Sequence, residues 1–143
     1  MKHFIDMDGV LVDLQRDLTK AQICAQVPSM TIEDWANLPK TEAFDWWCRM
    51  IIWGPGAYIL TACASSIVYE GKLRWISHHI PSMVNRVIFV PHGTKHRLAS
   101  RPTDMLYDDY SKNINDWITA GGTGVLCDTT TGFPVTMRRH EDD

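Results

Sequence analysis

The stretch FIDMDGVLVD, residues 4–13, decides the fold. It begins as an apolar strand, continues into Asp6 and Asp8, and places Gly9 directly after them. Alternate side chains of an extended segment point to the same side, so the two carboxylates face the same space. Either aspartate taken alone could simply cap a turn before a helix. Two acids at the end of one apolar strand favour a chemical site instead.

Further strand-like runs follow, with helical patterns between them. Short apolar runs such as VIFV predict strands that are buried on both faces. Strands that alternate with helices favour a parallel sheet covered on both sides. The sequence therefore predicts an α/β protein, Rossmann-like, with a three-layer α/β/α core and a five-stranded, mostly parallel sheet. The predicted strands cover residues 4–6, 57–62, 86–90, 104–109 and 123–127.

Two helices are predicted between the later strands, and each has one apolar face. Pro81 ends the first helix and Gly121 ends the second. The spacing of three and four residues between apolar positions is that of a helical stripe. The predicted faces are Tyr69, Leu73, Ile76 and Ile80 in the first helix, and Ile114, Trp117 and Ile118 in the second.

Residues 14–53 interrupt this alternation. They have helical patterns and no strand-like run, and Thr31 with Asp34 resembles a capping box. A connection of about 40 residues is long for a simple crossover. We therefore expect one domain, residues 1–143, with a helical cap inserted at about 14–53. The polar tail MRRHEDD is expected to fray.

Composition narrows the class of protein. The 143 residues carry a net charge of −3 and no run of 18 apolar residues, so neither a basic nucleic-acid surface nor a membrane span is expected. The aspartates within residues 1–20 argue against a signal peptide. The four cysteines form no C-x-x-C motif and are expected to be buried thiols of a cytoplasmic protein: Cys24, Cys48, Cys63 and Cys127. The oligomeric state stays open.

Other polar residues lie at the predicted carboxyl ends of the strands. Thr61 ends the second strand, Asp108 and Asp109 end the fourth, and Lys95 lies in the connection between the third and the fourth. Ligands of α/β sheets bind at this edge. Four neighbouring acids repel one another unless a cation compensates, and a hard divalent ion with oxygen ligands, most simply Mg²⁺, fits them. Mg²⁺ beside a lysine and a hydroxyl predicts phosphoryl chemistry.

The set DMDGVLVD, ILTA, Lys95 and LYDD, in this order, resembles the four motifs of the haloacid dehalogenase (HAD) superfamily of phosphohydrolases. Within it, the sequence is most similar to the small 5'(3')-deoxyribonucleotidase-like group. The resemblance implies a Mg²⁺-dependent phosphomonoesterase that forms an aspartyl phosphate and acts on nucleoside monophosphates. Another small phosphate ester, or a nucleic-acid 3'-phosphate, stays an alternative substrate. A phosphate-binding or regulatory module without hydrolysis is the alternative class.

The resemblance also implies roles for individual residues. Asp6 would be the nucleophile and Asp8 the general acid and base. The implied phosphate-binding residues are Asp8, Gly9, Thr61 and Lys95. The implied metal ligands are Asp6, Asp8, Asp108 and Asp109. Lys112 is a second candidate for the catalytic lysine.

The predicted insertion supplies candidates for substrate recognition. Trp46 and Trp47 lie in it, and an exposed indole there would stack on a nucleobase, whereas a buried one would pack the cap. Trp117 is expected in the core. The histidines show no metal-binding pattern: His78, His79, His92 and His96.

Overall fold

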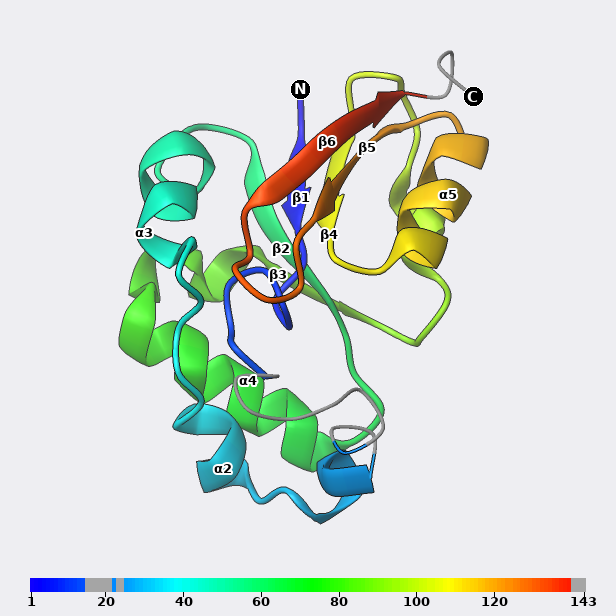
Figure 1. Ribbon diagram of the computed structural model, residues 1–143. Helices are drawn as coiled ribbons and strands as arrows, with labels where there is room; N and C mark the ends of the chain where they lie inside the picture. Colours follow the sequence, from blue (N-terminus) through cyan, green and yellow to red (C-terminus); the bar gives the residue numbers. More distant parts are fainter. Residues whose placement is uncertain (15–21, 23–24, 140–143) are drawn as a thin grey trace.

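The structure is a computed structural model that describes residues 1–14, 22 and 25–139 (Figure 1). Six strands form one sheet in the order β3-β2-β1-β4-β5-β6. β1 to β5 are parallel, and β6 pairs antiparallel with β5. The protein is therefore of the α/β class, compatible with the predicted Rossmann-like arrangement. The strands are β1 (His3–Ile5), β2 (Ala57–Ala62), β3 (Val87–Val90), β4 (Met105–Asp108), β5 (Thr123–Cys127) and β6 (Pro134–Arg139).

The prediction of five strands was wrong by one. β6 includes the Met-Arg-Arg part of the tail that was expected to fray, and the rest of that tail, residues 140–143, lies outside the described residues. Pairing with β5 through Thr123↔Arg139 and Val125↔Met137 gives this segment its backbone hydrogen bonds. Such pairing depends on a strand far outside the local sequence, so a polar segment adopts a strand without an apolar pattern.

Two apolar cores lie on opposite faces of the sheet. On one face, α4 (Ser66–His79) packs Trp75 and Ile76 against β1 and β2. On the other face, α5 (Ser111–Thr119) packs Trp117 against Phe4 of β1. The predicted apolar face of α5 is confirmed, since Ile114, Trp117 and Ile118 are all buried. The sheet therefore has helices on both faces.

The predicted face of α4 was partly wrong. Ile76 and the following Ile80 are buried, but Tyr69 is 46% exposed. The buried stripe instead includes Lys72, next to Trp75. Apolar periodicity fails here because a buried lysine occupies a position that the pattern treats as solvent-facing.

The third strand also differs from its prediction. All four residues of β3 are half-buried rather than fully buried. β3 is the edge strand beyond β2, so one side of it has no neighbouring strand. The local apolar run predicts the strand but not its place in the sheet.

The described part of the insertion between β1 and β2 contains short helices, which lie in two places. α2 (Ile32–Ala36) packs on α4, whereas α3 (Phe44–Trp47) and the π-helix η2 (Cys48–Ile52) lie higher, beside the sheet (Figure 1). The capping box of Thr31 and Asp34 is confirmed. Three short 3-10 helices complete the described elements: η1 (Val27–Ser29), η3 (Pro81–Arg86) and η4 (Lys95–Leu98).

Cys48, Cys63 and Cys127 are free thiols, Cys63 half-buried and the others buried, while Cys24 lies outside the described residues. Within the described chain, no helix has the length and apolarity that crossing a membrane requires.

Candidate functional site

The carboxyl ends of β1, β2 and β4 open into one pocket. Asp6 follows β1, Thr61 lies near the end of β2, and Asp108 ends β4. Because these strands are parallel neighbours, their ends lie side by side. The cavity has a volume of about 280 Å³ and is lined by all of the predicted acids, Gly9, Thr61 and Lys95. The structure thus brings these residues together at one edge of the sheet.

Lys95 lies between two of the carboxylates. Its Nζ donates to Oδ1 of Asp6 at 2.7 Å and to Oδ2 of Asp108 at 2.8 Å. The lysine is 3% exposed and begins η4, which follows the turn after β3. Burial alone would lower the pKa of Lys95, but Asp6 and Asp108 outweigh burial and raise the pKa. The lysine therefore holds a fixed positive charge between the two acids.

Asp108 is held from several directions. Besides Lys95, its carboxylate accepts from the backbone N–H of Tyr110 at 2.9 Å and from the side-chain amide of Asn113 at 3.1 Å. Asn113 lies in the first turn of α5. The start of this helix and the end of β4 therefore fix the orientation of one carboxylate.

More carboxyl groups lie near Lys95 than one ammonium group can neutralise. Ligand atoms of Asp6, Asp108 and Asp109 lie within 4.8 Å of one another. Burial and then Asp108 raise the pKa of Asp6 well above its usual range, although Lys95 opposes this. Burial and Asp108 likewise raise the pKa of Asp109 to about 6. Three crowded carboxylates with one ammonium form a donor set of oxygens that fits a hard divalent cation.

A second lysine at the site was not predicted. Lys72 of α4 forms an ion pair with Oδ2 of Asp8 at 2.9 Å and donates to Oγ1 of Thr61 at 2.7 Å. It also donates to the backbone carbonyl of Ala62 at 2.9 Å and is 2% exposed. A lysine on the buried side of an amphipathic helix is the sequence signal that could have found it, because such a residue needs a charged partner.

Lys112, the second candidate for the catalytic lysine, does not lie at this site. Lys112 is exposed on α5 and pairs with Asp116 one turn along the same helix, at 2.8 Å. Lys112 is not one of the described residues that line the pocket.

Gly9 allows the chain to turn close to the acids. Its φ of +83° lies in the left-handed region, where residues with a side chain are strained. A Cβ built on Gly9 would collide with the carboxylate of Asp109. The Oγ1 of Thr129 donates to the same carboxylate at 2.7 Å. Glycine is therefore required both for the turn and for the position of Asp109.

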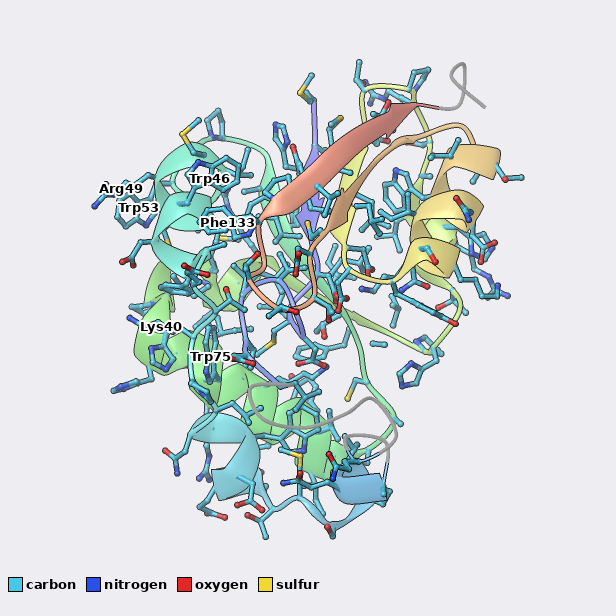
Figure 2. The ribbon with its side chains drawn as sticks, in the orientation of Figure 1. Lys40, Trp46, Arg49, Trp53, Trp75 and Phe133 are labelled. Carbon is cyan, nitrogen blue, oxygen red and sulfur yellow. The ribbon has the colours of Figure 1, made fainter. Side chains whose placement is uncertain are left out.

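The substrate role expected for Trp46 and Trp47 is contradicted. Trp47 is 0% exposed, and its Nε1 donates to the carbonyl of Gly132 at 2.8 Å. Its ring also packs on Tyr107 of β4. Trp46 lies toward Phe133 on the outside of the sheet (Figure 2), and neither indole lines the pocket. The second half of the insertion folds back along the sheet, away from its carboxyl edge.

A different tryptophan of the insertion lines the pocket. Trp35 of α2 is 3% exposed, and its ring lies 5.4 Å from Nζ of Lys72. A Cβ on Gly71 would collide with Cβ of Trp35, so the glycine lets α2 and α4 approach closely. Within the described chain, the Nε1 of Trp35 is buried without a hydrogen-bond acceptor. Val27 of η1 lines the same wall.

Comparison of the sequence with family models and with curated proteins finds no match. The function of the chain is therefore inferred from the chemistry of the pocket residues.

Proposed function

We propose that this protein is a Mg²⁺-dependent phosphomonoesterase of the HAD type, which dephosphorylates nucleoside monophosphates as a 5'(3')-nucleotidase. One observation carries the proposal. Lys95 joins Asp6 to Asp108, while Asp8, two residues along, pairs with Lys72 beside Thr61. Two carboxylates with separate cationic partners suit separate roles in one reaction.

In the proposed first step, Asp6 attacks phosphorus. One carboxylate oxygen of Asp6 forms the new P–O bond as the bond to the leaving oxygen breaks, which yields an aspartyl phosphate. A carboxylate approaches a phosphate dianion only where positive charge offsets their repulsion. Lys95 lies 2.7 Å from Asp6 and supplies part of that charge without leaving the site.

Asp8 is the proposed general acid and base. It gives a proton to the leaving oxygen in the first step and takes one from the attacking water in the second. Water then releases inorganic phosphate and restores the Asp6 carboxylate. The Asp8 side chain is partly exposed, at 28%, so it reaches solvent where Asp6 does not. This exposure suits exchange of protons with water.

The phosphoryl oxygens are proposed to bind between the two lysines. The hydroxyl of Thr61 accepts from Lys72, which leaves its own O–H free to donate to the phosphate. The ammonium groups of Lys72 and Lys95 face this position from α4 and from η4. Asp6, Asp108, Asp109 and the backbone carbonyl of Asp8 would hold Mg²⁺. When bound, Mg²⁺ neutralises charge on the phosphate and the carboxylates.

A mononucleotide fits the proposed site better than a polymer. The cavity of about 280 Å³ lies near the lower end of the range for small-molecule sites. The leaving group would lie against the wall formed by Val27 and Trp35, where an indole suits a nucleobase. The net charge of −3 offers no extended basic track for a nucleic-acid strand.

The alternatives are another substrate class and a protein without hydrolytic activity. A screen for released phosphate in the presence of Mg²⁺ distinguishes them. The panel contains nucleoside 5'- and 3'-monophosphates, sugar phosphates, a small aryl phosphate and a 3'-phosphorylated oligonucleotide, with Asp6→Asn as the control. We expect nucleoside monophosphates to be hydrolysed fastest. Faster release from the sugar phosphate or the oligonucleotide would assign another substrate class. No release from any substrate would overturn the enzyme proposal.

A further inference from the structure

The turn that joins β5 to β6, residues 128–133, lies beside the acidic cluster (Figure 1). β5 pairs in parallel with β4, so the carboxyl ends of these two strands lie next to each other. Within the turn, Oγ1 of Thr129 donates to Oδ2 of Asp109 at 2.7 Å. A turn threonine more often bonds its own backbone, as Thr131 does by accepting from the N–H of Phe133 at 3.2 Å. Thr129 therefore differs from its neighbour, because its partner is a carboxylate at the end of another strand.

Hydrogen bonds on two sides fix the turn. Within it, the N–H of Gly132 donates to the carbonyl of Asp128 at 2.7 Å. From the start of α3, the N–H of Ala43 donates to the carbonyl of Thr131 at 3.0 Å. The Nε1 of Trp47 donates to the carbonyl of Gly132 at 2.8 Å. A shift of the turn would break these bonds to α3, so the turn holds its side chains at a set distance from β4.

The carboxylate of Asp109 is held at one of its two oxygens. Oδ2 accepts from Thr129, and the same oxygen is the nearest atom to the position that a Cβ on Gly9 would occupy. A threonine side chain has few rotamers, which keeps its hydroxyl in one place. A hydrogen bond at Oδ2 favours coordination of a cation through the other oxygen alone. Asp109 is thus prepared as a ligand with one donor atom.

The number of donor atoms from one carboxylate distinguishes two common divalent cations. Mg²⁺ requires six oxygens in near-ideal octahedral geometry at about 2.0–2.1 Å. Ca²⁺ accepts about six to eight oxygens at about 2.3–2.6 Å, and it often takes both oxygens of one carboxylate. A carboxylate that offers one fixed oxygen suits the smaller cation. Release of the second oxygen would remove this preference.

We propose that Thr129 is a positioning residue that makes the acidic cluster selective for Mg²⁺ over Ca²⁺. Its hydroxyl acts through Asp109, which belongs to the cluster with Asp6 and Asp108. Partners of this kind, which orient a metal ligand by a hydrogen bond, typically contribute about 10- to 100-fold to metal affinity. The inference rests on the proposed Mg²⁺ site but on neither the nucleotide substrate nor the hydrolysis.

Isothermal titration calorimetry of the full chain, with MgCl₂ and CaCl₂ in separate experiments, tests this role. Thr129→Val keeps the shape of the side chain and removes the hydroxyl. We expect the Kd for Mg²⁺ to rise about 10- to 100-fold. The Kd for Ca²⁺ should change less than about threefold, since Ca²⁺ can then bind both oxygens of Asp109. Thr129→Ser keeps the hydroxyl and should retain the selectivity of the wild type.

Thr130→Val makes the same substitution at the exposed neighbouring position of the turn and is the matched control. It should leave both dissociation constants unchanged. Thermal unfolding in the presence of a chelator checks that each variant folds. If Thr129→Val is unfolded, Thr129→Ala replaces it, because alanine removes the hydroxyl without placing a new methyl group against the carboxylate.

The possible results separate this role from the Mg²⁺ site itself. Unchanged Mg²⁺ affinity without the Thr129 hydroxyl would overturn the proposal and leave the site intact. Equal weakening of Mg²⁺ and Ca²⁺ would overturn the selectivity, since Thr129 would then support only the structure of the turn. A wild type that binds no Mg²⁺ at about 10 mM would overturn the metal site and this role together. Phosphate release does not enter the measurement, so a wrong substrate assignment would not alter the result.

Discussion

Lys95 and Lys72 contact different carboxylates, although both are almost fully buried at the same edge of the sheet. Lys95 connects Asp6 to Asp108, which come from neighbouring strands. Lys72 connects Asp8 to Thr61 and reaches them from a helix. Breaking a buried pair leaves an uncompensated charge, so each lysine also holds its acids in place. Replacing one of these lysines therefore removes a positive charge and also releases the acids that the lysine holds in place.

At the nucleophile, Asp6→Asn keeps the size of the side chain and removes its negative charge. We expect kcat to fall on the order of 10³-fold or more, as for other enzymes that lose a nucleophile. Steady-state phosphate release measures the effect. Asp116→Asn makes the same chemical change on the surface of α5 and should leave kcat unaltered. Turnover by Asp6→Asn near the wild-type rate would disprove the role of Asp6.

The lysine that the sequence analysis missed is tested in the same way. Lys72→Met keeps most of the volume but leaves Asp8 and Thr61 without their donor. We expect kcat to fall about 10²- to 10³-fold, the usual effect of losing one donor to a developing oxyanion. Lys112→Met is the matched control, because that lysine pairs only at the surface and such pairs contribute about 0–1 kcal/mol. Equal activity of the two variants would argue against a catalytic contribution of Lys72.

At the scale of the elements, the insertion divides between the pocket and the body of the protein. α2 contributes Trp35 to the pocket wall, whereas α3 contributes Trp47 to the core. Aromatic residues alone therefore do not identify the part of an insertion that meets a ligand. The path by which the chain returns to β2 decides which part of the insertion lines the pocket.

Trp35 is now the candidate for recognition of the leaving group. Trp35→Ala should lower kcat/KM for the preferred nucleotide about 5- to 150-fold, the factor implied by about 1–3 kcal/mol of stacking. Hydrolysis of a small alkyl phosphate should hardly change. Trp35→Phe keeps a ring but removes Nε1, which is buried without an acceptor among the described residues, and isolates any contribution of that donor.

Trp46→Ala serves as the control for this experiment, since Trp46 packs on Phe133 outside the pocket. It should leave kcat/KM for both substrates within about twofold of the wild type, as expected for a residue that makes no contact in the transition state. An equal loss on both substrates with Trp35→Ala would mean that Trp35 only packs α2 against α4.

The sequence predicted the elements that have their own local signal. Asp6, Asp8 and Asp108 follow short apolar runs, and parallel pairing is enough to bring such ends together. β6 was missed because its hydrogen bonds come from β5 rather than from an apolar pattern. The buried side of α4 was missed because Lys72 lies on it. The prediction placed Tyr69 on the buried face instead, because apolar periodicity does not identify a lysine that is buried through its pairing with an acid.

At the scale of the whole molecule, the two ends of the sheet have different character. The carboxyl ends of the strands place acids and lysines in the pocket, whereas the amino-terminal ends of β1 and β2 adjoin the apolar side chains of Met50 and Ile51. Both ends belong to one six-stranded sheet, which has a helix packed on each face. Binding at the pocket can therefore be measured through the stability of the entire domain.

The charge of the pocket predicts how the molecule responds to Mg²⁺. Three carboxylates crowd one lysine, so the folded state holds repulsion that a bound cation relieves. A cation that binds only the folded state stabilises it by about 2.7 kcal/mol at 100 times its dissociation constant. For a domain of this size that corresponds to a rise in Tm of about 5–10 °C. Thermal unfolding at one protein concentration, with Mg²⁺ or with a chelator, measures the shift without any assay of activity.

Asp109→Asn separates this explanation from general binding of ions. The substitution removes one of the crowded charges and keeps an oxygen that can accept from Thr129. We therefore expect the Mg²⁺-free variant to melt at a higher temperature than the Mg²⁺-free wild type, and Mg²⁺ to raise its Tm by less. Asp116→Asn, on the exposed side of α5, should keep the full Mg²⁺ shift of the wild type. A Mg²⁺ shift of the same size in Asp109→Asn would exclude Asp109 from the metal site. A wild type whose Tm is unchanged by Mg²⁺ would exclude the acidic cluster as a metal centre altogether.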